Sequence, residues 1–196
     1  MTVTIAHTLD DACAALAADP EALVLAGGTD LMVEVNRGDR SIGNVVAIDR
    51  VRELRGWTRE GDVLRIGAGM TYAEMADPEF AALVPALAQA ARTIGSPQIR
   101  ATGTIGGNVA TASPAGDMLP VLVALDAVVE LRSSDGGRHL PLDEFVVGVK
   151  ANALDPGELI TAVRVPVLDG PQEFLKIGPR NAMVIAVASV ALVVDV

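Results

Sequence analysis

The sequence predicts an α+β fold with two lobes: a small βαβ lobe over residues 1–54 and a larger lobe on a mostly antiparallel sheet over residues 55–170. Strand and helix patterns alternate at the start of the chain, and hairpin turn signals follow later. Of the 196 residues, 51% are hydrophobic but only 3% aromatic. Such a chain is expected to pack a core of aliphatic side chains. Residues 171–196 are expected to begin a truncated C-terminal domain.

The first lobe is predicted from five short patterns in order. Residues 3–8 have strand composition, and residues 8–19 have Ala and Leu at helical spacing, with Thr8 as the cap and acids in the first turn. A buried strand ends at Ala26, and two glycines then lead into a short helix that Gly38 closes. A third strand follows at 44–48, which completes a βαβ arrangement.

The larger lobe begins with a hairpin whose turn signal is Glu-Gly-Asp at 60–62. Thr71 and Glu74 have capping-box spacing, and an Ala-rich helix ends at Gly95 after a kink or restart at Pro85. A further helix and several strands are predicted at 118–126, 127–133, 137–142, 157–167, 174–178 and 186–196. The last of these would be unpaired unless something covers it.

Charge and residue counts exclude several classes of protein. The chain has 15 Lys and Arg against 25 Asp and Glu, which argues against nucleic-acid or anionic-membrane surfaces. The N-terminus lacks a signal-type segment, and no apolar run reaches the roughly 18 residues of a membrane span, so a cytoplasmic protein without a span is expected. Cys13 is the only cysteine, so the chain cannot hold an iron–sulfur cluster alone, and its thiol is expected to be buried. His7 and His139 are too isolated in sequence to predict a metal site.

Two glycine segments have the most informative chemistry. Ala-Gly-Gly-Thr-Asp-Leu at 26–31 follows a strand, and Thr-Ile-Gly-Gly-Asn at 104–108 has the same small and hydroxyl-bearing residues. In both segments free backbone N–H groups are expected around a concavity, with Thr29 or Asp30 capping the helix after the first. Two such loops without Lys or Arg suit the pyrophosphate of a dinucleotide cofactor, with Asp117 as a possible ribose acceptor.

A structural interpretation competes with the ligand site. A Gly-Gly pair after a strand is usually a tight turn, because glycine adopts positive φ without steric cost. Asp117 could equally cap the helix at 118–126. The residues alone leave the two interpretations about evenly balanced. Other site types fit worse, since the Gly-Ala-Gly at 67–69 belongs to a hairpin, and neither a P-loop nor a serine-nucleophile elbow occurs.

Four segments together resemble one known family. They are AGGTDL at 26–31, IGAGMTYAEM at 66–75, the long stretch at 94–127, and FLKIGPRNAMVIA at 174–186. In order and spacing they are similar to the FAD-binding medium subunit of the molybdenum hydroxylases. This family includes the flavin subunits of carbon monoxide dehydrogenase and of xanthine dehydrogenase-like enzymes.

The resemblance implies two α+β lobes with FAD between them, followed by a smaller third domain. It implies that the first loop wraps the FAD pyrophosphate and that the second closes from the other side. It also implies polar contacts to ribityl or ribose hydroxyls, an apolar lining, and one basic residue near the flavin edge. The implied cofactor-binding residues are Ala26, Gly27, Gly28, Thr29, Asp30, Leu31, Ile94, Thr104, Ile105, Gly106, Gly107, Asn108, Ser113, Asp117, Ile160 and Lys176.

The resemblance also implies a role within a complex. A large subunit with a molybdenum-pterin centre would oxidise the substrate, and a small subunit with two 2Fe–2S clusters would carry electrons to the flavin. The flavin would pass them to NAD or another acceptor, so no catalytic acid or base is named in this chain. The alternative is a flavin- or nucleotide-binding module without turnover. Family members usually continue for about a hundred residues more, so the chain is expected to be a fragment, a natural short form, or completed by another polypeptide.

Overall fold

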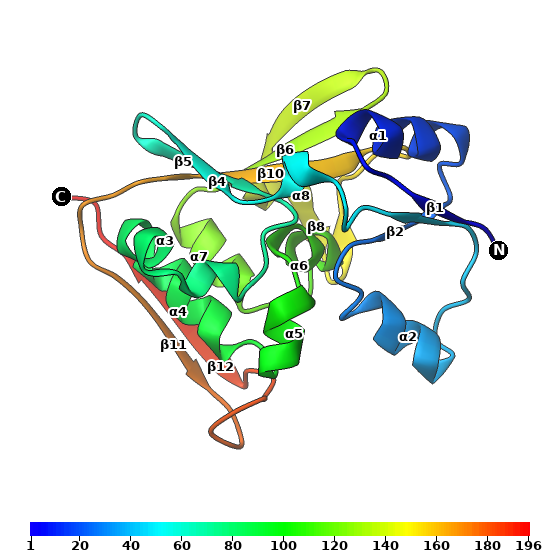
Figure 1. Ribbon diagram of the computed structural model, residues 1–196. Coiled ribbons are helices and arrows are strands. Elements are labelled where there is room, and N and C mark those ends of the chain that lie inside the picture. The colour runs from blue at the N-terminus through cyan, green and yellow to red at the C-terminus, as the bar shows by residue number, and fades with distance from the viewer.

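The computed structural model describes residues 1–196, and it begins with a three-stranded parallel sheet. The strands β1 (Val3–Ile5), β2 (Leu23–Leu25) and β3 (Val45–Ala47) have the order β1-β3-β2. Helices α1 (Leu9–Ala18) and α2 (Leu31–Arg37) connect them in turn. The predicted βαβ beginning of the chain is therefore confirmed (Figure 1).

Local sequence signals fix the ends of these two helices. The Thr8 hydroxyl accepts from the Asp11 amide at 3.1 Å, and the Asp11 carboxylate accepts from the Thr8 amide at 3.0 Å. This reciprocal capping box satisfies two of the donors that the first turn of a helix leaves free. At the end of α2, Gly38 is left-handed with φ +78° and donates back into the last turn. Both predicted helix ends are confirmed.

A five-stranded antiparallel sheet forms the centre of the molecule. Its order is β4-β5-β10-β6-β7, so β10 lies in the middle although it follows the other four strands in sequence. The predicted hairpin joins β4 to β5 through Gly61, which has φ +65°. The bounds of the strands are β4 Trp57–Glu60, β5 Val63–Gly67, β6 Val128–Ser133, β7 Gly136–Pro141 and β10 Leu159–Pro166.

Helices bury one side of this sheet in a core of 27 residues (Figure 1). The Ala-rich segment stops after Leu83 and restarts at Pro85, as predicted. Thr71 and Glu74 exchange the predicted capping bonds, but the turn that follows is a 3-10 helix. The helices are α3 Pro78–Leu83, α4 Pro85–Thr93, α5 Pro97–Thr102, α6 Ile105–Thr111, α7 Met118–Ala124 and α8 Leu142–Phe145, with 3-10 turns at Arg52–Leu54 and Glu74–Ala76.

The last two strands form a separate antiparallel ribbon, β11 (Gln172–Ile177) and β12 (Ala188–Val193). The final strand, expected to be unpaired unless something covers it, has a partner, because β12 pairs with β11 along its whole length. One face of the ribbon packs on α4 and α7 through Phe174 and its neighbours. The other face is exposed and apolar, with the side chains Leu175, Ile177, Val190 and Leu192.

The three-stranded sheet and the five-stranded sheet are connected through helix α1 and a shared core. Helix α1 packs beside β6, where Arg132 forms a 2.7 Å ion pair with Asp10. Cys13 is buried in a second core of ten residues, as expected, and Leu159 of β10 joins the same core. The division into domains at residues 54 and 170 stays a prediction. No helix combines the length and apolar character needed to cross a membrane.

Candidate functional site

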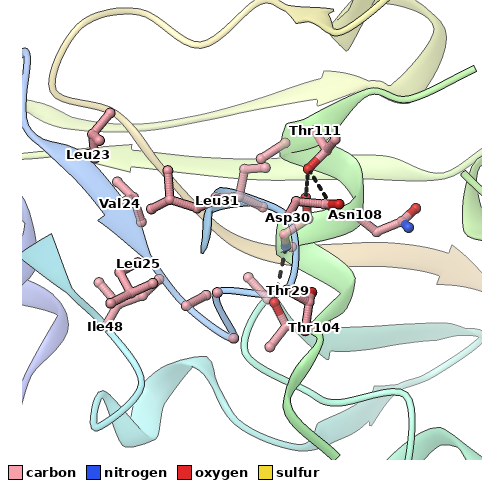
Figure 2. Close-up of a pocket in the computed structure, with 18 of the residues that line it drawn as sticks. Leu23, Val24, Leu25, Thr29, Asp30, Leu31, Ile48, Thr104, Asn108 and Thr111 are labelled. Carbon is pink, nitrogen blue, oxygen red and sulfur yellow. Dashed lines mark hydrogen bonds between the residues drawn. The ribbon is translucent and has the colours of Figure 1, made fainter. Parts of the chain in front are cut away.

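A cavity of about 450 Å³ lies between the carboxyl end of β2, helix α6 and the start of β10. Its volume is within the range of about 300–1,000 Å³ that is typical of ligand sites. The crevice at the carboxyl ends of parallel strands is a common place for ligands, because loops and free amides gather there. Figure 2 shows Leu23, Val24, Leu25 and Ile48 on one side and Asp30 close to Asn108 and Thr111 on the other.

The first glycine segment lines this cavity with unused hydrogen-bond donors. No backbone amide from Ala26 to Leu31 donates a hydrogen bond within the chain. Leu25 is the last residue of β2, so the sheet leaves these amides free as the chain turns toward α2. Six consecutive free donors without a basic side chain supply the chemistry that an anion-binding loop needs, as expected from the sequence.

Gly27 and Gly28 are each required to be glycine, but for different structural reasons. Gly28 has φ +68°, a left-handed conformation that side chains with a Cβ disfavour. A Cβ on Gly27 would lie 1.9 Å from the carbonyl oxygen of Thr102, at the end of α5. Gly27 therefore allows the first segment to approach the rest of the fold, while Gly28 sets the direction of the loop.

The second glycine segment differs from the expectation. Residues 105–108 belong to helix α6, which Thr104 caps through a 3.1 Å bond from the Gly107 amide. The Ile105 and Gly106 amides donate to Met70 and Ala68. The expectation of free amides in this segment is therefore wrong, because the Thr104 cap and the chain that follows β5 already accept from them.

Gly106 has a packing role that predicts a clear effect. A Cβ there would lie 2.6 Å from the Cβ of Ala68 and 2.8 Å from its carbonyl oxygen. We expect Gly106→Ala to lower the free energy of unfolding by about 1–3 kcal/mol, because backbone must move to relieve the overlap. The matched control is Gly107→Ala, whose Cβ would meet only the Thr104 hydroxyl at 3.1 Å. Urea unfolding of both variants measures the difference, and equal stabilities would refute the packing role.

Asn108 and Tyr72 give the cavity a polar wall. The Oδ1 atom of Asn108 is buried and has no hydrogen-bond partner within the chain, so a donor from a ligand would satisfy it. Tyr72 lines the same cavity, and burial raises the pKa of its phenol, which stays protonated at neutral pH. The sequence predicts a turn before Tyr72 and a capping box around it, but no ligand contact for Tyr72 itself. Its position in the cavity depends on the packing of α5 and α6.

Three charged side chains line the cavity between α2 and the hairpin formed by β8 (Val146–Gly148) and β9 (Ala151–Asn152). Lys150 donates to Glu34 at 2.9 Å, and Arg40 reaches the other Glu34 oxygen at 3.4 Å. The hydrogen bond from Lys150 is the main cause that lowers the pKa of Glu34, and the same bond raises the pKa of Lys150. The sequence does not predict the pairing of Lys150 with Glu34, because 116 residues separate them.

Asp30 also connects the two sides of the cavity. It lies at the N-cap position of α2 but makes no capping bond with its side chain. Its carboxylate instead accepts from the Thr111 hydroxyl of α6 at 3.1 Å, as Figure 2 shows. The expected cap by Thr29 or Asp30 is therefore wrong, because the side chain of Asp30 points across the cavity.

Eleven of the sixteen predicted residues line the cavity and five do not. Ile105 is fully buried in the large core, and the Ser113 hydroxyl accepts from the Ala115 amide. Asp117 and Lys176 form a 2.6 Å ion pair instead, with side chains only 8% and 5% exposed. Asp117 stands at the N-cap position of α7 without capping it. The residues that line the cavity are Ala26, Gly27, Gly28, Thr29, Asp30, Leu31, Thr104, Gly106, Gly107, Asn108 and Ile160, and those outside it are Ile94, Ile105, Ser113, Asp117 and Lys176.

The fold and sequence of this chain match one family of known proteins. Residues 1–168 match the family model described as "FAD binding domain in molybdopterin dehydrogenase". The chain belongs to this family. FAD is the family's cofactor, and the predicted resemblance and α+β class are both confirmed.

Named relatives and solved structures agree with this family. The nicotinate dehydrogenase FAD-subunit of Eubacterium barkeri is 36% identical over 179 residues, which are 88% of this chain and 60% of the relative. The glyceraldehyde dehydrogenase medium chain of Sulfolobus acidocaldarius is 35% identical over 96% of this chain and 68% of its own. A chain of reconstituted CO dehydrogenase from Oligotropha carboxidovorans superposes with a TM-score of 0.92 at 30% identity, covering 97% of this chain and 68% of that one. This chain thus spans 60% of the first of these relatives.

The residues present fit a dinucleotide such as FAD. The free amides of 26–31 suit a pyrophosphate, which needs several donors converging on its oxygens. The buried Asn108 Oδ1 needs a donor, and hydroxyl or amino groups of the cofactor are donors. The cavity also has apolar walls from Leu25, Ile48 and Ile160, against which a ring system can pack.

Proposed function

We propose that this chain binds FAD in the cavity and works as the electron-transfer subunit of a molybdenum-containing dehydrogenase or hydroxylase. Electrons would enter from 2Fe–2S clusters of a partner subunit and leave to NAD or another acceptor. The proposal rests most on one observation, the run of free amides from Ala26 to Leu31 beside a cavity of cofactor size.

Within this proposal the chain provides binding and orientation. Bound FAD would supply the redox chemistry, as redox cofactors generally do. The amides of 26–31 would hold the pyrophosphate, and Asn108 would accept a hydrogen bond from the cofactor. The protonated Tyr72 keeps the adjoining wall uncharged. Ile94, Ile105, Ser113, Asp117 and Lys176 are proposed as further contacts on the strength of the resemblance alone.

The names of relatives support a multi-subunit assembly. The protein from Hydrogenophaga pseudoflava that is 34% identical over 147 residues is a carbon monoxide dehydrogenase medium chain. Another relative, 37% identical over 149 residues, is the alpha subunit of the 6-hydroxypseudooxynicotine dehydrogenase complex of Paenarthrobacter nicotinovorans. By analogy, we propose a large molybdenum-pterin subunit and a small 2Fe–2S subunit as partners of this chain, in the cytoplasm.

A visible absorption spectrum tests this proposal. The purified chain, mixed with FAD and passed through gel filtration, is expected to retain one equivalent and to be yellow. NADH or a reducing dye should then bleach the flavin band. The isolated chain should oxidise no purine, aldehyde, carbon monoxide or aromatic substrate until the two partner subunits are added.

The same experiment separates the alternatives. Retained FAD that neither NADH nor a dye reduces would indicate a flavin-binding module without turnover. Retention of ADP but not FAD would indicate a nucleotide-binding module and would overturn the proposal. Turnover of an organic substrate by the isolated chain, with no molybdenum or iron present, would do the same.

A further inference from the structure

The segment from Gly28 to Gly38, which contains α2, is weakly tied to the rest of the fold. No residue of α2 is buried, and Met32 and Val33 are exposed. Every backbone hydrogen bond donated from residues 28–40 is local, such as Met32 to Gly28 and Asp39 to Glu34. Figure 1 shows α2 at the edge of the molecule, beyond the small sheet. Segments with few buried contacts open at low free-energy cost.

Glycines stand at both ends of this segment. Gly28 has φ +68° and Gly38 has φ +78°. Both therefore have a left-handed backbone conformation. Glycine, unlike other residues, can exchange this conformation for one with negative φ at little steric cost. Such positions absorb the backbone rotation when a loop swings as a unit. A Cβ on Gly38 would meet nothing within 4 Å, so no packing contact requires glycine there.

Two side-chain contacts hold the segment down across the cavity. The Lys150 ammonium donates to the Glu34 carboxylate at 2.9 Å, and the Thr111 hydroxyl shares its proton between the Gly107 carbonyl at 2.8 Å and the Asp30 carboxylate at 3.1 Å. All of these residues line the cavity. Closure of the segment therefore depends on polar contacts that span the site.

Lys150, the partner of Glu34 in the ion pair, lies in a turn with a strained backbone. Lys150 has φ +53°, a left-handed conformation that costs a non-glycine residue about 1 kcal/mol or more. Its amide donates to the carbonyl of Ala112 at 3.0 Å, and Ala112 is itself left-handed with φ +45°. This arrangement holds the turn between β8 and β9 against the end of α6. Lys150 thus projects from an anchored turn toward a loosely held helix.

We propose that Gly28–Gly38 is a hinged flap over the cofactor cavity and that the Lys150–Glu34 ion pair is its latch. This inference rests on the proposed function, since it takes FAD as the ligand beneath the flap. With the latch closed, the free amides of 26–31 stay in their binding arrangement. When the latch opens, the flap swings about the two glycines and FAD enters or leaves. Lys150 is a positioning residue, and it acts through α2.

Measured FAD affinity and release test the latch. Lys150→Met should raise the dissociation constant and the release rate of FAD by roughly two- to fivefold, the effect expected of one partly exposed ion pair. Lys150→Arg should restore most of the loss, because guanidinium can also pair with Glu34. The difference between wild type and Lys150→Met should shrink in 1 M salt, which screens exposed charges. The matched control is Arg132→Met, which removes the exposed ion pair with Asp10 away from the cavity.

Limited proteolysis of the FAD-free chain tests the flap without the cofactor. Trypsin should cut after Arg37 and Arg40 several times faster in Lys150→Met than in wild type, because cleavage follows the open population. Trypsin should cleave Glu34→Gln at a rate similar to that of Lys150→Met. It should cleave the double variant no faster than either single variant. Arg132→Met should match wild type.

The outcomes distinguish the two proposals. If wild type binds no FAD, the proposed function fails, while the tryptic rates still report on the flap. If Lys150→Met weakens FAD binding but leaves the tryptic rates unchanged, Lys150 binds the cofactor directly and the flap is overturned. Additive effects of Lys150→Met and Glu34→Gln would overturn the latch in the same way. Unchanged affinity, release and cleavage would overturn both parts of the inference.

Discussion

Valine at position 28 should abolish stoichiometric FAD retention while leaving the secondary structure in place. Gly28 has φ +68°, and a β-branched side chain strongly disfavours this conformation. Its Cβ would also crowd Leu25 and Met32, at 3.2 and 3.4 Å. The loop would leave its present path, and the free amides of 26–31 would move with it. Gly28 lies outside every helix and strand, so circular dichroism should change little.

A matched glycine separates loss of the site from general strain. Gly61 has φ +65°, has open space around its would-be Cβ, and lies in the β4–β5 hairpin, outside the cavity lining. Gly61→Val should destabilise the chain to a comparable degree but retain FAD. Gel filtration after mixing with FAD, with flavin content read by absorbance, should show Gly28→Val at least about tenfold weaker than Gly61→Val. Stoichiometric FAD on Gly28→Val would show that the loop assignment is wrong.

Methionine in place of Lys176 should cost about 3–5 kcal/mol of the free energy of unfolding. Lys176 is the ion-pair partner of Asp117, and both side chains are nearly inaccessible to water. One Asp117 oxygen already has no hydrogen-bond partner, so removal of Lys176 would leave the carboxylate wholly uncompensated. Breaking a buried pair on one side is far more destabilising than replacing both partners. Urea unfolding followed by circular dichroism measures the effect.

The double variant Asp117→Asn with Lys176→Met provides the control. It removes both charges and should recover more than half of the lost stability. If the single variant does not fold, the double variant still tests the pair. Equal stabilities for the single and double variants would contradict the assignment. FAD titration of the double variant also tests the predicted cofactor contacts, because a stable fold with unchanged affinity would exclude Asp117 and Lys176 from the site.

Local signals in the sequence predicted most of the elements. Thr8 with Asp11 fixed one helix start, Pro85 fixed a restart, and Gly61 fixed a hairpin, because each acts through neighbours within four residues. The first glycine segment was located for the same reason. Its free amides follow from a strand that ends at Leu25 before the next helix begins.

What the sequence did not reveal depends on contacts between distant segments. The stretch at 105–111 has two glycines and reads as a loop, but the Thr104 cap and the approach of Gly106 to Ala68 make it a helix. Lys150 enters the site only because a short hairpin, itself not predicted, turns toward α2. The pairing of Asp117 with Lys176 spans 59 residues and has no periodic signal.

The position of β10 has a consequence for synthesis on the ribosome. This strand, Leu159–Pro166, separates β5 from β6 in the central sheet, and its partners in β5 are Val63–Gly67. Chain emerges from the ribosome in sequence order, so β5 and β6 are both complete well before the strand that joins them. Until then each has an open edge that another chain can pair with. During the interval of nearly a hundred residues between β5 and β10, the open edge of β5 therefore exposes the nascent chain to pairing with other chains.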